Sequence, residues 1–252
     1  MGLWTKEHFI TVIPAFIVMI IVGLLLGRLL KDKDEKVKFL PLQIISIILL
    51  ALEFMKQGYN AKGGYDLYAL PFHYCSLFLY LLPLHSFYRG KYRKAVNSAT
   101  LGCLASLFLF MLVMPDIVYS ANNIKECFKN FGSFHTVIFH NLVCLYFVLT
   151  LSLKLYEFNV KKDLKVMAIF LAIYVVIATI LSLSLKVNFH NLYKCNLGMV
   201  EDIRLAMVGA IGFAGHMIYV CILFVLTILF AYGAYFAAKG VVALIKNKVN
   251  GK

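Results

Sequence analysis

The chain has 252 residues, of which 62% are hydrophobic and 15% are charged. Ordinary soluble domains carry about a quarter charged residues, so this composition excludes a typical soluble protein. The formal net charge of +13 would suit a nucleic-acid-binding protein. However, the lysines and arginines lie in short connections between long apolar runs, where they orient a membrane protein. We therefore expect no nucleic acid as a partner.

Apolar runs of about 20 residues recur along the chain, and this is the length that crosses a bilayer as a helix. We predict an all-α, polytopic transmembrane helix bundle that forms a single domain over residues 1–252. The first run is too long for a cleavable signal peptide, so we interpret it as a retained helix. Seven spans are predicted, over residues 9–30, 38–57, 68–88, 95–115, 134–156, 165–186 and 213–238.

The interval from residue 205 to 245 is apolar for longer than one span needs. We interpret residues 199–211 as an interfacial or re-entrant piece and the rest as the seventh helix. Two spans in this interval would make eight helices in all. The distribution of positive charge favours an odd number.

Seventeen of the 25 lysines and arginines lie in or beside the connections after the first, third and fifth spans, or near the C-terminus after the seventh span. Only eight lie on the other side. Positively charged connections stay in the cytoplasm, which places the N-terminus outside and the C-terminus inside. We expect a multi-pass protein of the cell membrane. An even number of spans would destroy this alternation.

With this topology, several titratable side chains fall at one depth in the outer halves of the spans. Polar groups in hydrocarbon are costly and therefore often functional. The alternatives are side chains that reach the interface or pack in the core, and His8 and His190 are expected to be plain interfacial residues. We expect one cavity open to the outer leaflet, surrounded by Glu53, His73, Cys75, His135, His140 and His216.

Two segments carry a resemblance to a known family. They are the run Leu70-Pro-Phe-His-Tyr-Cys-Ser76 and the run Phe131-Gly-Ser-Phe-His135, with His140 five residues later. Both resemble the YwaF-type bacterial integral membrane proteins, as does the preceding helix with Glu53. The resemblance covers roughly residues 40 to 240.

This resemblance implies an activity, because the family has vertebrate relatives described as acyltransferases that move fatty acyl chains between phospholipids. It implies Cys75 as the nucleophile and His140 as its base, with His135 in reserve. A thiolate is a strong nucleophile, and an imidazole can take and return its proton. The alternative for Cys75 is a small hydrophobic residue in a buried helix. Membrane phospholipid is the expected partner.

The function is therefore predicted as a Cys/His phospholipid acyltransferase or lipase acting at the outer leaflet. The alternative is a transporter or membrane binding protein with an outward-facing cavity lined by histidines. A seven-helix sensor is a third hypothesis, weakened because no soluble signalling domain fits in the chain. Glu53, His73 and His216 would bind ligand in either of the first two cases.

Two smaller patterns concern packing and cysteine chemistry. Gly23 and Gly27 form a small-xxx-small pattern, which we interpret as contact with a neighbouring helix of the same chain rather than a dimer interface.

The six cysteines include no Cys-x-x-Cys pair, so we expect no metal and no cofactor. Cys127 and Cys195 lie in predicted external loops, where they are either free thiols or a disulfide. The oligomeric state is not predicted.

Overall fold

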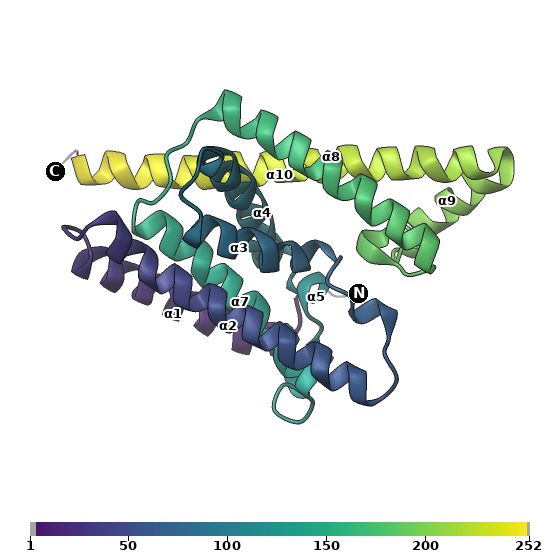
Figure 1. Ribbon diagram of the computed structural model, residues 1–252, viewed down its shortest axis with the longest axis horizontal. Coiled ribbons are helices and arrows are strands. Elements are labelled where there is room, and N and C mark those ends of the chain that lie inside the picture. The colour runs from purple at the N-terminus through teal and green to yellow at the C-terminus, as the bar shows by residue number, and fades with distance from the viewer. Residues whose placement is uncertain (1–3, 251–252) are drawn as a thin grey trace.

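The computed structural model describes residues 4–250, and these residues form helices and connecting turns without strands (Figure 1). Within this part of the chain, six helices are long and apolar enough to cross a membrane. They are α1 (Lys6–Leu29), α2 (Glu35–Lys62), α4 (Arg93–Val113), α7 (Phe131–Ser152), α8 (Val160–Leu185) and α10 (Phe213–Asn250). The shorter elements are η1 (Leu67–Ala69), η2 (Tyr74–Leu77), α3 (Phe78–Phe87), α5 (Pro115–Val118), α6 (Ala121–Lys125), η3 (Phe189–Asn191) and α9 (Gly198–Ile211).

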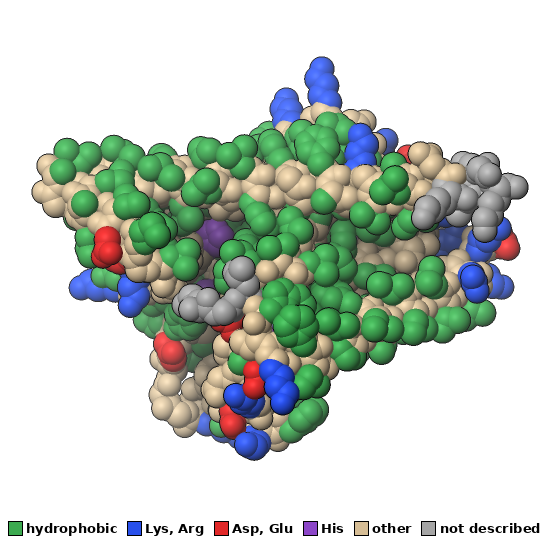
Figure 2. Space-filling model, turned by 180° about the vertical axis from the view of Figure 1, so that it is seen from behind, with side chains coloured by type: hydrophobic (Ala, Val, Ile, Leu, Met, Phe, Trp, Pro, Cys, Tyr) green, Lys and Arg blue, Asp and Glu red, His purple; other side chains and the backbone are tan. Residues whose placement is uncertain are grey.

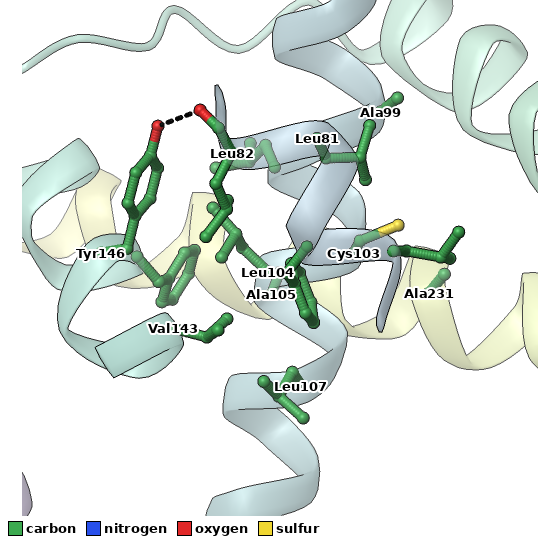
Figure 3. Close-up of a cluster of buried hydrophobic side chains, with 14 of the residues drawn as sticks. Leu81, Leu82, Ala99, Cys103, Leu104, Ala105, Leu107, Val143, Tyr146 and Ala231 are labelled. Atoms are coloured by element: carbon green, nitrogen blue, oxygen red, sulfur yellow. Dashed lines mark hydrogen bonds between the residues drawn. The ribbon is translucent and has the colours of Figure 1, made fainter. Parts of the chain in front are cut away.

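The helices pack as two groups joined by α4. Helices α1 and α2 both lie against α7, whereas α10 crosses α8, and α4 contacts α7, α8 and α10 (Figure 1). The core lies between these helices, where Leu82 of α3 packs with Leu104 of α4 and Val143 of α7 (Figure 3). The hydroxyl of Tyr146 donates to the carbonyl of Leu82 at 3.2 Å, so the polar group of this buried tyrosine has a hydrogen-bond partner.

Apolar side chains also cover much of the outer surface. Ile17 and Leu24 of α1 and Leu229 of α10 are each more than half exposed. Green apolar side chains are spread over the whole face in Figure 2, and lysines and arginines stand mainly at its margins. Such a surface is unfavourable in water but suits contact with lipid tails.

The third predicted span, over residues 68–88, is wrong as a continuous α-helix. Its first half consists of the short turns η1 and η2, and only the ten residues of α3 are α-helical. Pro71 explains the interruption, because a proline disfavours helical backbone at the preceding residue and has no N–H to donate. His73 is likewise extended.

The interrupted segment nevertheless runs antiparallel to α2 along most of its length. Near its start, Gln57 Nε2 donates to the carbonyl of Ala69 at 2.8 Å. Near its end, Gln43 Nε2 donates to the carbonyl of Ser86 at 3.1 Å. The guanidinium of Arg89 then lies 4.1 Å from the centre of the Phe39 ring. The chain between residues 69 and 89 therefore returns to the end of the bundle where α2 begins.

The interval from residue 205 to 245 divides as expected. A 14-residue helix, α9, ends at Ile211 and is followed by Gly212, whose positive φ of 61° is a conformation that glycine adopts without strain. Helix α10 begins immediately afterwards and packs against α9. A Cβ atom at Gly215 would lie 2.1 Å from the carbonyl oxygen of Met207, so only glycine permits this tight turn.

The small-xxx-small pattern of α1 packs inside the chain, against α7. A Cβ atom at Gly23 would lie 2.7 Å from Val148 Cγ1 and 2.8 Å from Ser152 Oγ. A Cβ atom at Gly27 would lie 3.1 Å from the carbonyl oxygen of Ser152, its nearest neighbour. The expected contact between neighbouring helices of one chain is therefore confirmed.

Gly23→Leu should destabilise the protein by about 2 kcal/mol, because the added side chain overpacks the α1–α7 contact. Thermal unfolding of the purified protein in detergent would measure this loss. Gly58→Leu is the matched control, since Gly58 lies inside α2 with nothing within 4 Å of an added Cβ. Equal effects of the two substitutions would contradict the packing role of Gly23.

The possible disulfide between Cys127 and Cys195 is absent. Both residues are free, buried thiols. Cys127 packs with Val12 and Met111, whereas Cys195 belongs to the main core cluster. Of the two alternatives, the free thiols are therefore the correct one, because each thiol is buried in a different apolar cluster.

Candidate functional site

The centre of the site is a close contact between a carboxylate and an imidazole on two transmembrane helices. Glu53 of α2 and His135 of α7 are both 8% exposed, and Glu53 Oε2 lies 3.3 Å from His135 Nε2. The other carboxylate oxygen of Glu53 lies 2.7 Å from Lys56 Nζ, one turn further along α2. A buried carboxylate is tolerated only when it is paired in this way.

The same helix end holds the segment that carries Cys75. Gln57 Nε2 donates to Glu53 Oε1 at 2.5 Å and to the carbonyl of Ala69 at 2.8 Å. The hydroxyl of Tyr65 donates to Gln57 Oε1. A single amide side chain therefore joins the Glu53 carboxylate to η1, six residues before the cysteine.

His73 and Tyr74 hold the next part of this segment. His73 Nε2 donates to the carbonyl of Tyr68 at 2.9 Å, and its ring lies 5.2 Å from that of Phe189. The ring of Tyr74 stacks on that of His190 at 5.4 Å. Cys75 follows directly in η2 and is half-buried. His73 therefore braces the backbone near the cysteine.

Helix α8 supports the segment from the other side. The hydroxyl of Tyr174 donates to the carbonyl of Phe72 at 3.2 Å, and its ring lies 5.7 Å from the ring of His190. Burial lowers the pKa of His190 to about 4, so this imidazole is neutral at pH 7. The cysteine-bearing turn thus lies between α2, α8 and η3.

His140 lies deeper in α7 and is 7% exposed. Its Nδ1 lies 2.6 Å from the carbonyl of Thr136. A carbonyl only accepts, so Nδ1 carries the proton and Nε2 of the neutral ring is a free base. The ring also lies 6.3 Å from that of Tyr119, the residue that follows α5.

His216 belongs to a different group of contacts, at the start of α10. Its Nδ1 lies 3.4 Å from Arg204 Nη1, and Arg204 forms an ion pair with Glu201 at 2.6 Å. The hydrogen bonds from Arg204 hold the pKa of Glu201 at about 2. These contacts link α9 to α10. Within the described part of the chain, His216 forms no hydrogen bond or ion pair with Glu53 or His135.

His8 is not the water-facing interfacial residue that the sequence predicts. It is completely buried, and its Nε2 donates to the carbonyl of Tyr119 at 2.9 Å. Its other ring nitrogen lies 2.9 Å from Thr5 Oγ1. His8 therefore ties the start of α1 to the segment after α5, because the loop carbonyl needs a donor once it is buried.

Histidine side chains are visible in a recess beneath α10 in Figure 2. Among the described residues, no group of three or more histidine, cysteine or acidic side chains is arranged to hold a metal ion. The site thus offers a thiol, imidazoles and one paired carboxylate, which are the parts needed for nucleophilic and general-base chemistry.

A family profile decides the classification. The profile of the TMEM164 family matches residues 3–235. The chain belongs to the TMEM164 family. Comparisons with curated proteins and with solved structures find no match. All six candidate site residues of this TMEM164-family protein lie within the matched range, and the family is one of membrane proteins.

Sequence analysis missed one polar centre of this TMEM164-family protein. Asp163 of α8 is 2% exposed and accepts hydrogen bonds from Ser98 Oγ of α4 and Tyr235 Oη of α10, each at 2.6 Å. The backbone N–H of Asn159 donates at 2.8 Å to Oδ2, the oxygen that also accepts from Tyr235. The sequence shows Asp163 only as one acidic residue among lysines at a helix start, which ordinarily indicates a solvated position.

Proposed function

We propose that this protein is a thiol-dependent phospholipid acyltransferase that acts at the outer leaflet of the cell membrane. One observation carries the proposal: the Glu53–His135 pair is joined through Gln57 to the segment that presents Cys75. A carboxylate, an imidazole and a thiol on neighbouring elements are the components of a nucleophilic triad. The resemblance to YwaF-type proteins and their acyltransferase relatives agrees with this assignment.

In the proposed reaction, an imidazole takes the thiol proton and the Cys75 sulfur attacks the ester carbonyl of a phospholipid. The S–C bond forms, the ester C–O bond breaks, and the imidazolium returns the proton to the leaving alkoxide. A lysophospholipid departs. The hydroxyl of a second lysophospholipid then attacks the thioester, its proton passes to the imidazole, and the thiol is regenerated. Attack by water instead would give lipase activity.

Two histidines are candidates for the base. His135 has a carboxylate partner, Glu53, that would orient its ring and stabilise the imidazolium. His140 offers an unprotonated Nε2 but contacts Tyr119 and Thr136. We therefore favour His135 as the base and keep His140 as the alternative, while His73 and His216 would position a head group.

Turnover of a phospholipid with a labelled acyl chain by the purified protein tests this function. Transfer of the label to an added lysophospholipid is the expected result. His135→Ala should then lower the rate by at least about 100-fold if His135 is the base, and His140→Ala should do so if His140 is the base. Saturable lipid binding without turnover would instead favour the membrane binding protein or transporter.

We also propose seven membrane crossings, with the N-terminus outside. The segment from residue 69 to 89 would form the third crossing, because it returns along α2 from Gln57 to Phe39. Those 18 residues of α2 correspond to roughly 27 Å of helix, close to the thickness of a bilayer core. The charge asymmetry between the two ends supports the orientation.

Single cysteines introduced at Lys33, Lys91 and Lys161 should resist an impermeant thiol reagent in intact cells, and one at Asn60 should react. The reason is that the first three lie on the side with seventeen positive charges. Labelling is measured above the background of the unsubstituted protein, which has six cysteines of its own. Reaction at Lys33, Lys91 and Lys161 without reaction at Asn60 would contradict the orientation.

A further inference from the structure

A cavity lies at the opposite end of the bundle from Glu53 and His135. Its volume is about 600 Å³, and its walls come from the first turns of α2, α4 and α8 and from the connection between α7 and α8. A cavity of this size accommodates a small molecule or a lipid head group. The proposed acyl-transfer site uses none of its residues.

Positive charge dominates this cavity. Five cationic side chains line it, namely Lys38, Arg93, Lys94, Lys154 and Lys162. Only Arg93 has a carboxylate partner, Glu35, among the residues that the structure describes. The remaining acidic lining residues are Glu157 and Asp163, and Asp163 is already satisfied by three neutral donors. Four lysines thus face the cavity without a counter-ion from the described chain.

The backbone adds to this field. Helices α2, α4 and α8 all begin at the cavity, and the N-terminus of a helix carries partial positive charge and free N–H donors. Neither α2 nor α4 has a side-chain cap at its start. Two lining side chains, Asn97 and Tyr156, also have a buried polar atom without a partner.

Lys154 is held in an unusual conformation at the rim of the same cavity. It follows α7 with a φ of 55°, a left-handed position that glycine normally takes at the end of a helix. A lysine there keeps a charge in the cavity where glycine would be the relaxed choice.

We propose that this cavity binds a phosphate group, carried either by a phospholipid head group or by a soluble phosphorylated molecule. Phosphate matches the unpaired lysines, the guanidinium of Arg93 and the converging helix N-termini. The apolar walls formed by Leu155 and Phe158 would contact the less polar part of either ligand. This proposal does not depend on which side of the membrane the cavity faces.

Binding can be measured with the full chain in non-ionic detergent, using two probes. One is inorganic pyrophosphate at constant ionic strength, and the other is phosphatidic acid in mixed micelles, with phosphatidylcholine as the reference lipid. Saturable binding of pyrophosphate would indicate that the ligand is a soluble phosphorylated molecule. Saturable binding of phosphatidic acid, with weaker binding of phosphatidylcholine, would indicate that the ligand is a phospholipid. Either result supports the site.

The double variant Lys94→Gln, Lys162→Gln should weaken that binding by at least about tenfold, because it removes two charged contacts. Both side chains are exposed, so the fold should tolerate their replacement. Lys91→Gln, Lys161→Gln is the matched control, with the same change in net charge next to the cavity but outside its lining. The proposal is overturned if neither probe saturates, or if the control variant loses as much affinity as the lining variant.

Discussion

Replacement of Cys75 by serine should lower phospholipid acyl transfer by at least about 1,000-fold and leave the fold intact. A hydroxyl is a far weaker nucleophile than a thiolate at neutral pH, and loss of a nucleophile removes most of the rate of a catalytic triad. The exchange alters one atom of a half-buried side chain, so packing should change little. The measurement is the initial rate of label transfer to lysophospholipid.

Cys221→Ser is the control for this experiment, because Cys221 is an exposed thiol on α10. It should retain the full rate. Thermal unfolding of both variants would show that each remains folded. Unchanged turnover in Cys75→Ser would refute the role of the thiol and leave the binding protein as the better hypothesis.

Asp163→Ala should destabilise the protein by about 3 kcal/mol. Its carboxylate accepts from Tyr235 and from the backbone of Asn159, and loss of an acceptor costs about 1–3 kcal/mol for each buried donor left unpaired. Ser98 can redirect its hydroxyl to the carbonyl of Lys94, 2.9 Å away. A fall in Tm of roughly 6–12 °C in detergent is the expected readout.

Two further variants separate the hydrogen bonds of Asp163 from its charge. Asp163→Asn keeps one carbonyl oxygen as an acceptor, so it should lose less stability than the alanine variant. Glu157→Ala removes a nearby carboxylate that forms no ion pair within the described chain, and its Tm should change little. A tolerated Asp163→Ala would show that α4, α8 and α10 do not depend on this residue.

Much of the fold follows from apolar length and local chemistry. Six of the seven predicted spans correspond to long helices, because each run is uninterrupted for about 20 residues. The third failed because Pro71 and the extended His73 break the helix while tertiary contacts to α2 still carry the chain along the bundle. Hydropathy alone does not distinguish such a segment from a regular helix.

Some contacts of the candidate site were likewise expected from the sequence, and others were not. Glu53 and His135 were expected at one depth, and their side chains lie 3.3 Å apart. Lys56 pairs with Glu53, because a carboxylate in an apolar bundle needs a charged partner. His216 instead contacts Arg204, a residue whose role at the α9–α10 turn has no signature in the sequence. Asp163 was missed because its partners, Ser98 and Tyr235, lie 65 and 72 residues away.

A covalent acyl-enzyme is the most direct test of the proposed function. The protein is incubated with a phospholipid of known acyl composition, quenched in acid and digested, and the peptide that contains Cys75 is weighed by mass spectrometry. The account predicts that this peptide gains the mass of the fatty acid minus water and loses it on treatment with neutral hydroxylamine. An unmodified Cys75 peptide during active turnover, or acyl transfer to another cysteine such as Cys221, would contradict it.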